Sequence, residues 1–250
     1  MEAYATAAQV YAAGLVFARV GAMVMLVPGL GDASVPPRIR LSFALLMSLI
    51  LTPLVAPQVV VPTAVSGVAA EVIRETLIGL MIGAVLRMTL SALAVAGEVV
   101  ALQTTLGFAQ TANPSQAQPS ATLSTFLNLI GVTLVMTTDL HHMFFAAMVN
   151  SFDLFPFSRT PPIGDAATLA VQTFAGSFAL GIQLSAPVIV FSIVFNIATG
   201  LVGRIMPQFQ IFFVASPLAV IFGLSIFALS LGTIGMVWTE RYREVLGAFS

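Results

Sequence analysis

The sequence has 250 residues, of which 58% are hydrophobic and only 8% are charged, and its mean hydropathy is +1.03. Because a soluble domain needs about 25% charged residues to solvate its surface, this composition excludes a soluble globular protein and predicts an all-α integral membrane protein. The net charge is −1 and the nine basic residues, all arginines, form no basic run, which excludes nucleic acid as a partner. No cysteine is present, so disulfides and thiolate metal sites are excluded as well.

Apolar blocks follow one another along the chain, separated by charged residues, prolines and glycines. A transmembrane helix needs about 20 apolar residues, and each block is long enough to form one. The first block lacks the basic start of a secretory signal, so it predicts a helix that is retained. The six blocks are residues 5–28, 41–61, 68–103, 122–149, 166–203 and 205–239.

Three of these blocks are too long for one simple span. A continuous helix over residues 166–203 would reach about 57 Å, whereas the hydrocarbon core of a bilayer is about 30 Å thick. The long blocks must therefore be kinked, contain re-entrant turns, or be buried in protein outside a flat bilayer. Pro187 and Pro217 lie inside two of them and predict bends. The expected architecture is about six long, kinked helices arranged in hairpins.

Charged residues inside the third block require partners. Glu71, Arg74 and Glu75 are spaced i, i+3 and i+4, so they share a helical face. This spacing predicts an interfacial ion cluster where the helix meets water, with a proton relay as the alternative. Arg87 and Glu98 are deeper, and each would cost about 2.5–3.5 kcal/mol at the centre of a helix in lipid. They are about 16 Å apart along a straight helix, so each must meet another helix or another subunit.

Two further features concern packing and possible ligands. Gly79 and Gly83 form a small-xxx-small pair, which favours close packing of two helices. Asp139, His141 and His142 form the chain's histidine cluster. Adjacent histidines on a helix point about 100° apart, so both cannot easily bind one metal ion. The cluster therefore predicts a polar turn between two helices, and we expect neither a metal nor a cofactor.

The most unusual segment, residues 103–120, is polar but uncharged and is rich in Gln, Ser and Thr. Gly107, Pro114 and Pro119 oppose helix formation in it. Ordinary exposed loops usually carry some charge, whereas non-helical backbone at membrane depth is tolerated where it lines a water-filled cavity. The segment therefore predicts a loop in a cavity or pore.

Three motifs in order resemble the FliR family of flagellar export-gate proteins, which includes the injectisome protein SctT. They are Ser34-Val-Pro-Pro-Arg-Ile-Arg40; Gly97-Glu98-Val-Val-Ala-Leu102-Gln103 with the following Leu106-Gly-Phe108-Ala109 and Asn113-Pro114; and the segment from Gly200 to Leu218 with Arg204, Pro207, Gln208 and Pro217. Two departures stand out. Thr104-Thr105 replaces the usual Met-Gly or similar pair, and Asn113 stands where Asp is common.

The resemblance implies a structural, non-enzymatic subunit that assembles with FliP and FliQ into a gated channel for unfolded flagellar export substrates. It also implies the platform proteins FlhA and FlhB and membrane lipid as partners, in the bacterial inner membrane within the flagellar basal body. Residues 1–165 would be FliP-like and residues 166–250 would be a FliQ-like helical hairpin. The family's plug loop would fall on residues 104–120, and no catalytic residue, metal or cofactor is implied.

Two groups of site residues follow from the resemblance. The gate or plug-loop residues are Gln103, Gly107, Phe108, Asn113, Pro114, Gln116 and Gln118, and the structural or assembly residues are Arg38, Arg87, Glu98, Arg204, Pro207, Gln208 and Pro217. The alternatives are an injectisome export-gate subunit and a small-solute secondary transporter with broken helices near Pro187 and Pro217. An intramembrane enzyme is the weakest alternative, because no paired catalytic residues are visible.

Overall fold

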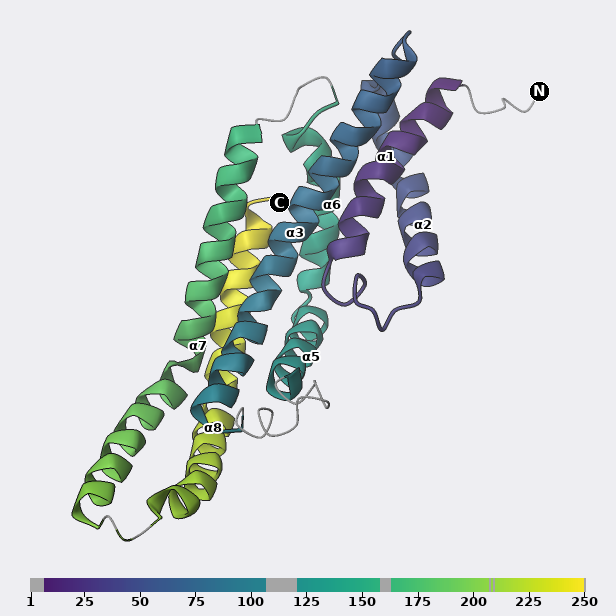
Figure 1. Cartoon of the computed structure of the whole chain (residues 1–250). Helices are drawn as coiled ribbons and strands as arrows, with labels where there is room; N and C mark the ends of the chain where they lie inside the picture. The colour runs from purple at the N-terminus through teal and green to yellow at the C-terminus, as the bar shows by residue number, and fades with distance from the viewer. Residues whose placement is uncertain (1–6, 107–120, 158–162, 207, 209, 250) are drawn as a thin grey trace. The chain divides into compact units, whose positions relative to one another are not determined.

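The described part of the chain is helical. The computed structural model describes residues 7–106, 121–157, 163–206, 208 and 210–249, and no strand occurs among them. Its elements are α1 (Ala7–Leu26), α2 (Pro37–Val55), the short 3-10 helix η1 (Ala56–Gln58), α3 (Val65–Gln103), α5 (Ala121–Thr137), α6 (Leu140–Leu154), α7 (Ile163–Ile205) and α8 (Ile211–Gly247) (Figure 1). The prediction of an all-α membrane protein is confirmed.

The predicted apolar blocks correspond closely to helices. Among the described residues, α1, α2, α3, α7 and α8 are long and apolar enough to cross a membrane. The block 122–149 is not one straight helix, because it is divided into α5 and α6 at Thr138 and Asp139. Asp139 has a left-handed backbone with φ of 58°, which ends the helical path locally. Counted as one bent span, α5 and α6 raise the number of candidate spans from five to six.

The longest helices continue through their internal prolines. α7 has 43 residues with Pro187 inside it, and α8 has 37 residues with Pro217 inside it. A proline removes one backbone hydrogen bond and bends a helix without necessarily ending it, and the ribbon of α7 bends partway along its length (Figure 1). As an α-helix, α7 is about 65 Å long, more than twice the thickness of a hydrocarbon core of about 30 Å.

The chain forms two compact units that are each assembled from separate stretches of sequence. The first contains residues 1–89, 136–174 and 242–250, and the second contains residues 90–135 and 175–241. The division predicted at residue 165 separates a FliP-like part from a FliQ-like part. It is a statement about resemblance and not about compact units, so it stays a prediction.

In the first unit, α3 packs closely on α1 at its two glycines. A Cβ atom added at Gly79 would lie 2.2 Å from the carbonyl oxygen of Arg19, and one at Gly83 would lie 2.8 Å from the Cβ atom of Leu26. Such approaches are possible only without a side chain. The predicted close-packing face is therefore confirmed, and its partner is α1.

We expect Gly79→Ala to lower the free energy of unfolding by about 1–3 kcal/mol, because the added methyl group must push the two helices apart. Gly14→Ala is the matched control, since a Cβ atom at Gly14 has nothing within 4 Å. Alanine is the better helix former by about 0.8–1.0 kcal/mol, so the control should be neutral or slightly stabilised. Thermal unfolding in detergent measures both, and equal midpoints for the two variants would contradict this packing.

Candidate functional site

A buried arginine joins three segments of the first unit. The guanidinium of Arg19, on α1, donates from Nε to Oε2 of Glu75 on α3 at 2.6 Å. Its Nη1 and Nη2 donate to the carbonyl oxygens of Ser151 and Phe155 at 2.6 and 2.7 Å. The side chains of Arg19 and Glu75 are both 0% exposed. The pair is therefore fully desolvated and provided with hydrogen bonds, which is the condition under which a buried ion pair is tolerated.

Aromatic and charged groups complete this Arg19 network, defined as Arg19, Glu75, Arg74 and their contacts at the end of α6 and directly after it. The guanidinium carbon of Arg19 lies 4.3 Å from the ring centroid of Phe152, within cation–π range. Arg74 Nε lies 3.4 Å from Oε1 of Glu75, and its Nη2 donates to the carbonyl of Phe157. The network thus fixes α1, α3 and the end of α6 to one another.

The sequence-based interpretation of this region is partly wrong. A water-facing ion cluster was expected, but Glu75 is 0% exposed. Glu71 and Arg74 are partly exposed, and Glu71 accepts a hydrogen bond from the hydroxyl of Tyr11. Arg19 was missed as a site residue, although it is the one charge inside the first apolar block and that isolation was a usable signal.

Arg87 and Glu98 each meet another segment, as expected. Arg87 Nη1 lies 3.3 Å from Oδ1 of Asp32 in the loop after α1, within the first unit. In the second unit, the hydroxyl of Ser124 at the start of α5 lies 2.9 Å from Oε1 of Glu98 and donates to it. A Cβ atom at Gly97 would lie 2.6 Å from Cα of Ser124, so the Gly97-Glu98 pair seats the start of α5 directly on α3.

A polar ladder marks the end of α3 in the second unit. Gln103, the last residue of α3, accepts through Oε1 a hydrogen bond from the hydroxyl of Ser192 on α7 at 2.7 Å. Asn196, one turn further along α7, donates from Nδ2 to the same hydroxyl at 3.2 Å. Thr104 is fully buried against Gly223 of α8, where a Cβ atom would lie 2.4 Å from its Cγ2. The segment 103–120 is therefore firmly held where it begins.

Thr105 leaves the helix in a strained conformation. Its φ is 60°, a left-handed value that β-branched residues rarely adopt. Its Oγ1 atom is buried and has no hydrogen-bond partner among the described residues. Glycine is the residue that ordinarily ends a helix in this conformation. The resembled family usually has Met-Gly or a similar pair where this chain has Thr104-Thr105, so glycine is also the residue expected at position 105.

Thr105→Gly should raise the free energy of unfolding by about 1 kcal/mol, because it removes the left-handed strain of a side chain together with an unpaired hydroxyl. Thr104→Gly should do the opposite, since it empties a buried contact against α8. Thermal unfolding of the two variants and of the parent chain measures both effects. A Thr105→Gly variant that is less stable than its parent would contradict the assignment of strain to Thr105.

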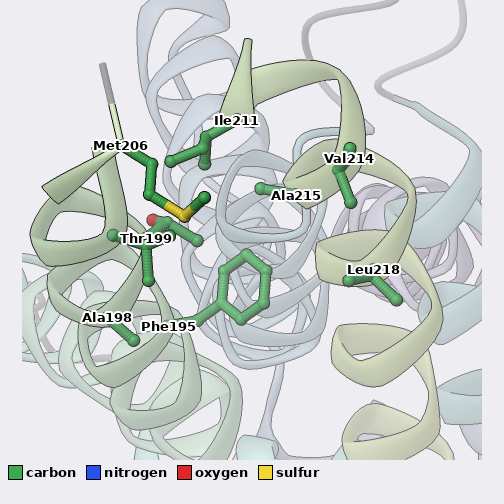
Figure 2. A pocket seen from close by; sticks show the side chains of 9 residues that line it. Phe195, Ala198, Thr199, Met206, Ile211, Val214, Ala215 and Leu218 are labelled. Atoms are coloured by element: carbon green, nitrogen blue, oxygen red, sulfur yellow. The ribbon is translucent and has the colours of Figure 1, made fainter. Parts of the chain in front are cut away.

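The turn between α7 and α8 carries the third motif. Arg204 is exposed in the last turn of α7, where a basic side chain is favoured by the helix dipole. Gln208 is exposed in the turn, and Pro217 is exposed inside α8. Between the two arms lies a pocket of about 350 Å³ (Figure 2). Its lining side chains come from Phe195, Ala198, Thr199, Val202, Met206, Ile211, Val214, Ala215 and Leu218.

Several predicted site residues lie outside the described residues. These are Gly107, Phe108, Asn113, Pro114, Gln116, Gln118 and Pro207. Arg38 is described and is exposed at the start of α2, next to the two prolines that begin this helix.

The histidine cluster differs from its expected geometry. The polar turn between two helices is confirmed, since Thr138 and Asp139 separate α5 from α6. The prediction that the two histidine side chains diverge is wrong, because the ring centroids of His141 and His142 are 4.2 Å apart. One ligand atom from each of Asp139, His141 and His142 can be chosen so that all three lie within 4.8 Å of one another.

Comparison with known proteins places the whole chain in one family. The family described as "Bacterial export proteins, family 1" matches residues 10–245. The chain is 64% identical to flagellar biosynthetic protein FliR of Caulobacter vibrioides, with 100% of both chains covered. It is 30% identical to FliR of Aquifex aeolicus over 94% of this chain and 91% of the relative. It is 28% identical to FliR of Escherichia coli (strain K12) over 91% of this chain and 87% of the relative. The chain therefore belongs to family 1 of the bacterial export proteins.

Proposed function

We propose that the chain is a structural, non-enzymatic subunit of the flagellar type III protein export gate, and that it assembles with FliP and FliQ in the bacterial inner membrane. FlhA and FlhB are the further platform partners, and unfolded flagellar proteins are the substrates. The observation that carries the proposal is the long apolar hairpin of α7 and α8, most of whose surface is uncovered in the single chain. In the most apolar stretch of α8 only 17% of the residues are buried, against 56% in the most apolar stretch of α3.

Lipid alone does not suffice to cover this hairpin. In the second unit, Phe178 and Ile205 of α7 are 54% and 78% exposed, and they are about 40 Å apart along the helix. A hydrocarbon core is about 30 Å thick, and an average helix tilt of about 20° removes little of the excess. Large apolar side chains outside lipid would face water, at a cost of about 25 cal/mol per Å² of apolar surface. Neighbouring protein subunits remove this cost.

The pocket between the arms supports the same proposal. It lies beside the turn of the hairpin and is lined almost wholly by apolar side chains (Figure 2). In the assembled gate, apolar side chains of a neighbouring hairpin would fill it. The division into a FliP-like part, residues 1–165, and a FliQ-like hairpin, residues 166–250, is part of this proposal.

The loop that follows α3 is proposed as the plug. The polar ladder of Gln103, Ser192 and Asn196 holds its beginning through uncharged hydrogen bonds, and the segment up to residue 120 contains no charged residue. Such a loop can line or close a water-filled passage without the cost of burying a charge.

Arg204→Ala tests the role of the hairpin turn. We expect the yield of the assembled complex and the swimming speed to fall by at least about tenfold, since truncation of a hot-spot arginine in an interface costs about 2 kcal/mol or more. Arg204→Lys is the matched control, because it keeps the positive charge at the end of α7 and should retain most of the function. Normal complex yield and normal motility with Arg204→Ala would refute the proposed role of this turn.

A further inference from the structure

The turn between α5 and α6 brings together three groups that can bind a metal ion. Asp139 precedes α6, and His141 and His142 lie in its first turn. Nδ1 of His142 is 3.6 Å from Oδ1 of Asp139, and the ligand atoms of all three residues lie within 4.8 Å of one another. The ring of His141 packs edge to face on Phe145, with centroids 6.3 Å apart, and lies 4.2 Å from the ring of His142, centroid to centroid.

The backbone at Asp139 supports a ligand-binding role. An aspartate before the first helical residue normally accepts a hydrogen bond from a backbone N–H of the first turn. Asp139 makes no such capping bond, and its φ of 58° is a left-handed conformation that aspartate tolerates better than most residues. Oδ1 of its carboxylate lies 3.6 Å from Nδ1 of His142 instead.

We propose that Asp139, His141 and His142 form a binding site for a divalent transition-metal ion of the zinc class. Two imidazole nitrogens and one carboxylate oxygen, with water in the fourth position, form a donor set found in open zinc sites. Two ligands bound to one tetrahedral Zn²⁺ at about 2.0–2.1 Å lie about 3.4 Å apart. Closing from 4.8 Å requires only side-chain rotation, for which 77% and 70% exposure of Asp139 and His142 leaves room.

The bound ion would brace the first turn of α6 by joining the residue before it to two residues within it. This role goes beyond export and does not depend on it, because the three ligands come from one short segment of a single chain. Binding should therefore be measurable on the isolated full-length chain in detergent.

The composition makes the test unusually clean. The chain contains two histidines and no cysteine, so in a tag-free preparation any imidazole ligation of a metal reports this site. The metal-stripped chain is labelled with ¹⁵N-histidine and titrated with Zn²⁺, followed by nuclear magnetic resonance and calorimetry. The expected result is one Zn²⁺ per chain, with both imidazole signals shifted. Unchanged imidazole signals at saturating Zn²⁺ would overturn the proposal.

Substitutions separate ligation from folding. Asp139→Asn keeps a residue that tolerates the left-handed conformation but removes the carboxylate ligand, and His142→Ala removes one imidazole. Loss of groups that merely orient a ligand weakens metal sites by about 10–100-fold, so each variant should lose at least tenfold in affinity. Asp153→Asn, at an exposed aspartate within α6, should bind like the parent. Equal affinity in all three variants, with unchanged helicity by circular dichroism, would refute the site.

Discussion

Arg19→Ala is expected to lower the free energy of unfolding by about 3–5 kcal/mol, because removing one partner leaves a buried charge without compensation. The charge left behind is Glu75, which is 0% exposed. The same substitution removes the donors to the carbonyl groups of Ser151 and Phe155. A loss of this size is a large fraction of the stability of most proteins, which is about 5–15 kcal/mol. Thermal unfolding in detergent, followed by circular dichroism, measures it.

Two further variants test the cause of that loss. Arg19→Leu combined with Glu75→Leu removes both charges, and replacing a buried pair by apolar residues is often neutral, so the double variant should be more stable than Arg19→Ala. Arg38→Ala is the control for loss of an exposed arginine, and it should change stability by no more than about 0.5 kcal/mol. An Arg19→Ala chain that unfolds at the same temperature as Arg38→Ala would contradict the buried network.

Removal of the proposed plug has the second large expected effect, this time on permeability. Deleting residues 107–120 and joining the ends with a short Gly/Ser linker should let ions leak through the assembled gate, because the proposed passage would then lack its plug. Assembly should persist, since the deletion spares Gln103 and Thr104, which join the end of α3 to α7 and α8. The measurement is ion flux through reconstituted complexes, or growth in a salt to which the intact membrane is impermeable.

Replacement of residues 107–120 by a Gly/Ser segment of equal length is the matched control. Such a segment is a flexible coil without fixed structure, so it should leak less than the deletion and more than the native loop. A deletion variant as impermeable as the intact gate would show that this loop is not the plug.

The helical architecture could be predicted from the sequence, because it follows from local properties. Blocks of apolar residues that are free of charge determine where helices lie, and α3 ends at Gln103, the last residue of its predicted block. The block 122–149 is a mixed case: the polar cluster of Asp139, His141 and His142 predicted the turn that divides it, whereas the left-handed backbone of Asp139 could not be predicted from the residue pattern. Glycine spacing also predicted the packing of α3 at Gly79, though not which helix it would meet.

The contacts of the charged residues could not be predicted in the same way. Arg19 and Glu75 are separated by 56 positions, so no spacing rule connects them, and the local pattern around Glu75 instead favoured a surface cluster. The rule that adjacent helical side chains diverge by about 100° was equally misleading for His141 and His142. That rule fixes the Cα–Cβ directions, whereas rotation about the side-chain bonds decides where the ring nitrogens lie.

The strain at Thr105 illustrates the same limit. The sequence marks the Thr104-Thr105 pair as a departure from the resembled family's pattern, but it does not show which of the two threonines has a strained backbone. The structure divides their roles. Thr104 is buried in a tight contact with α8, while Thr105 adopts the left-handed conformation with φ of 60°.

Co-purification tests the central proposal most directly. The tagged chain is expressed at native level, extracted in mild detergent, and analysed by native mass spectrometry. An export-gate subunit should be recovered in a large, stable complex that contains FliP and FliQ, since the uncovered apolar surface of α7 and α8 has to be buried by partners. Recovery of the chain as a monomer or dimer that binds a small solute, without FliP or FliQ, would contradict the proposal and favour a transporter.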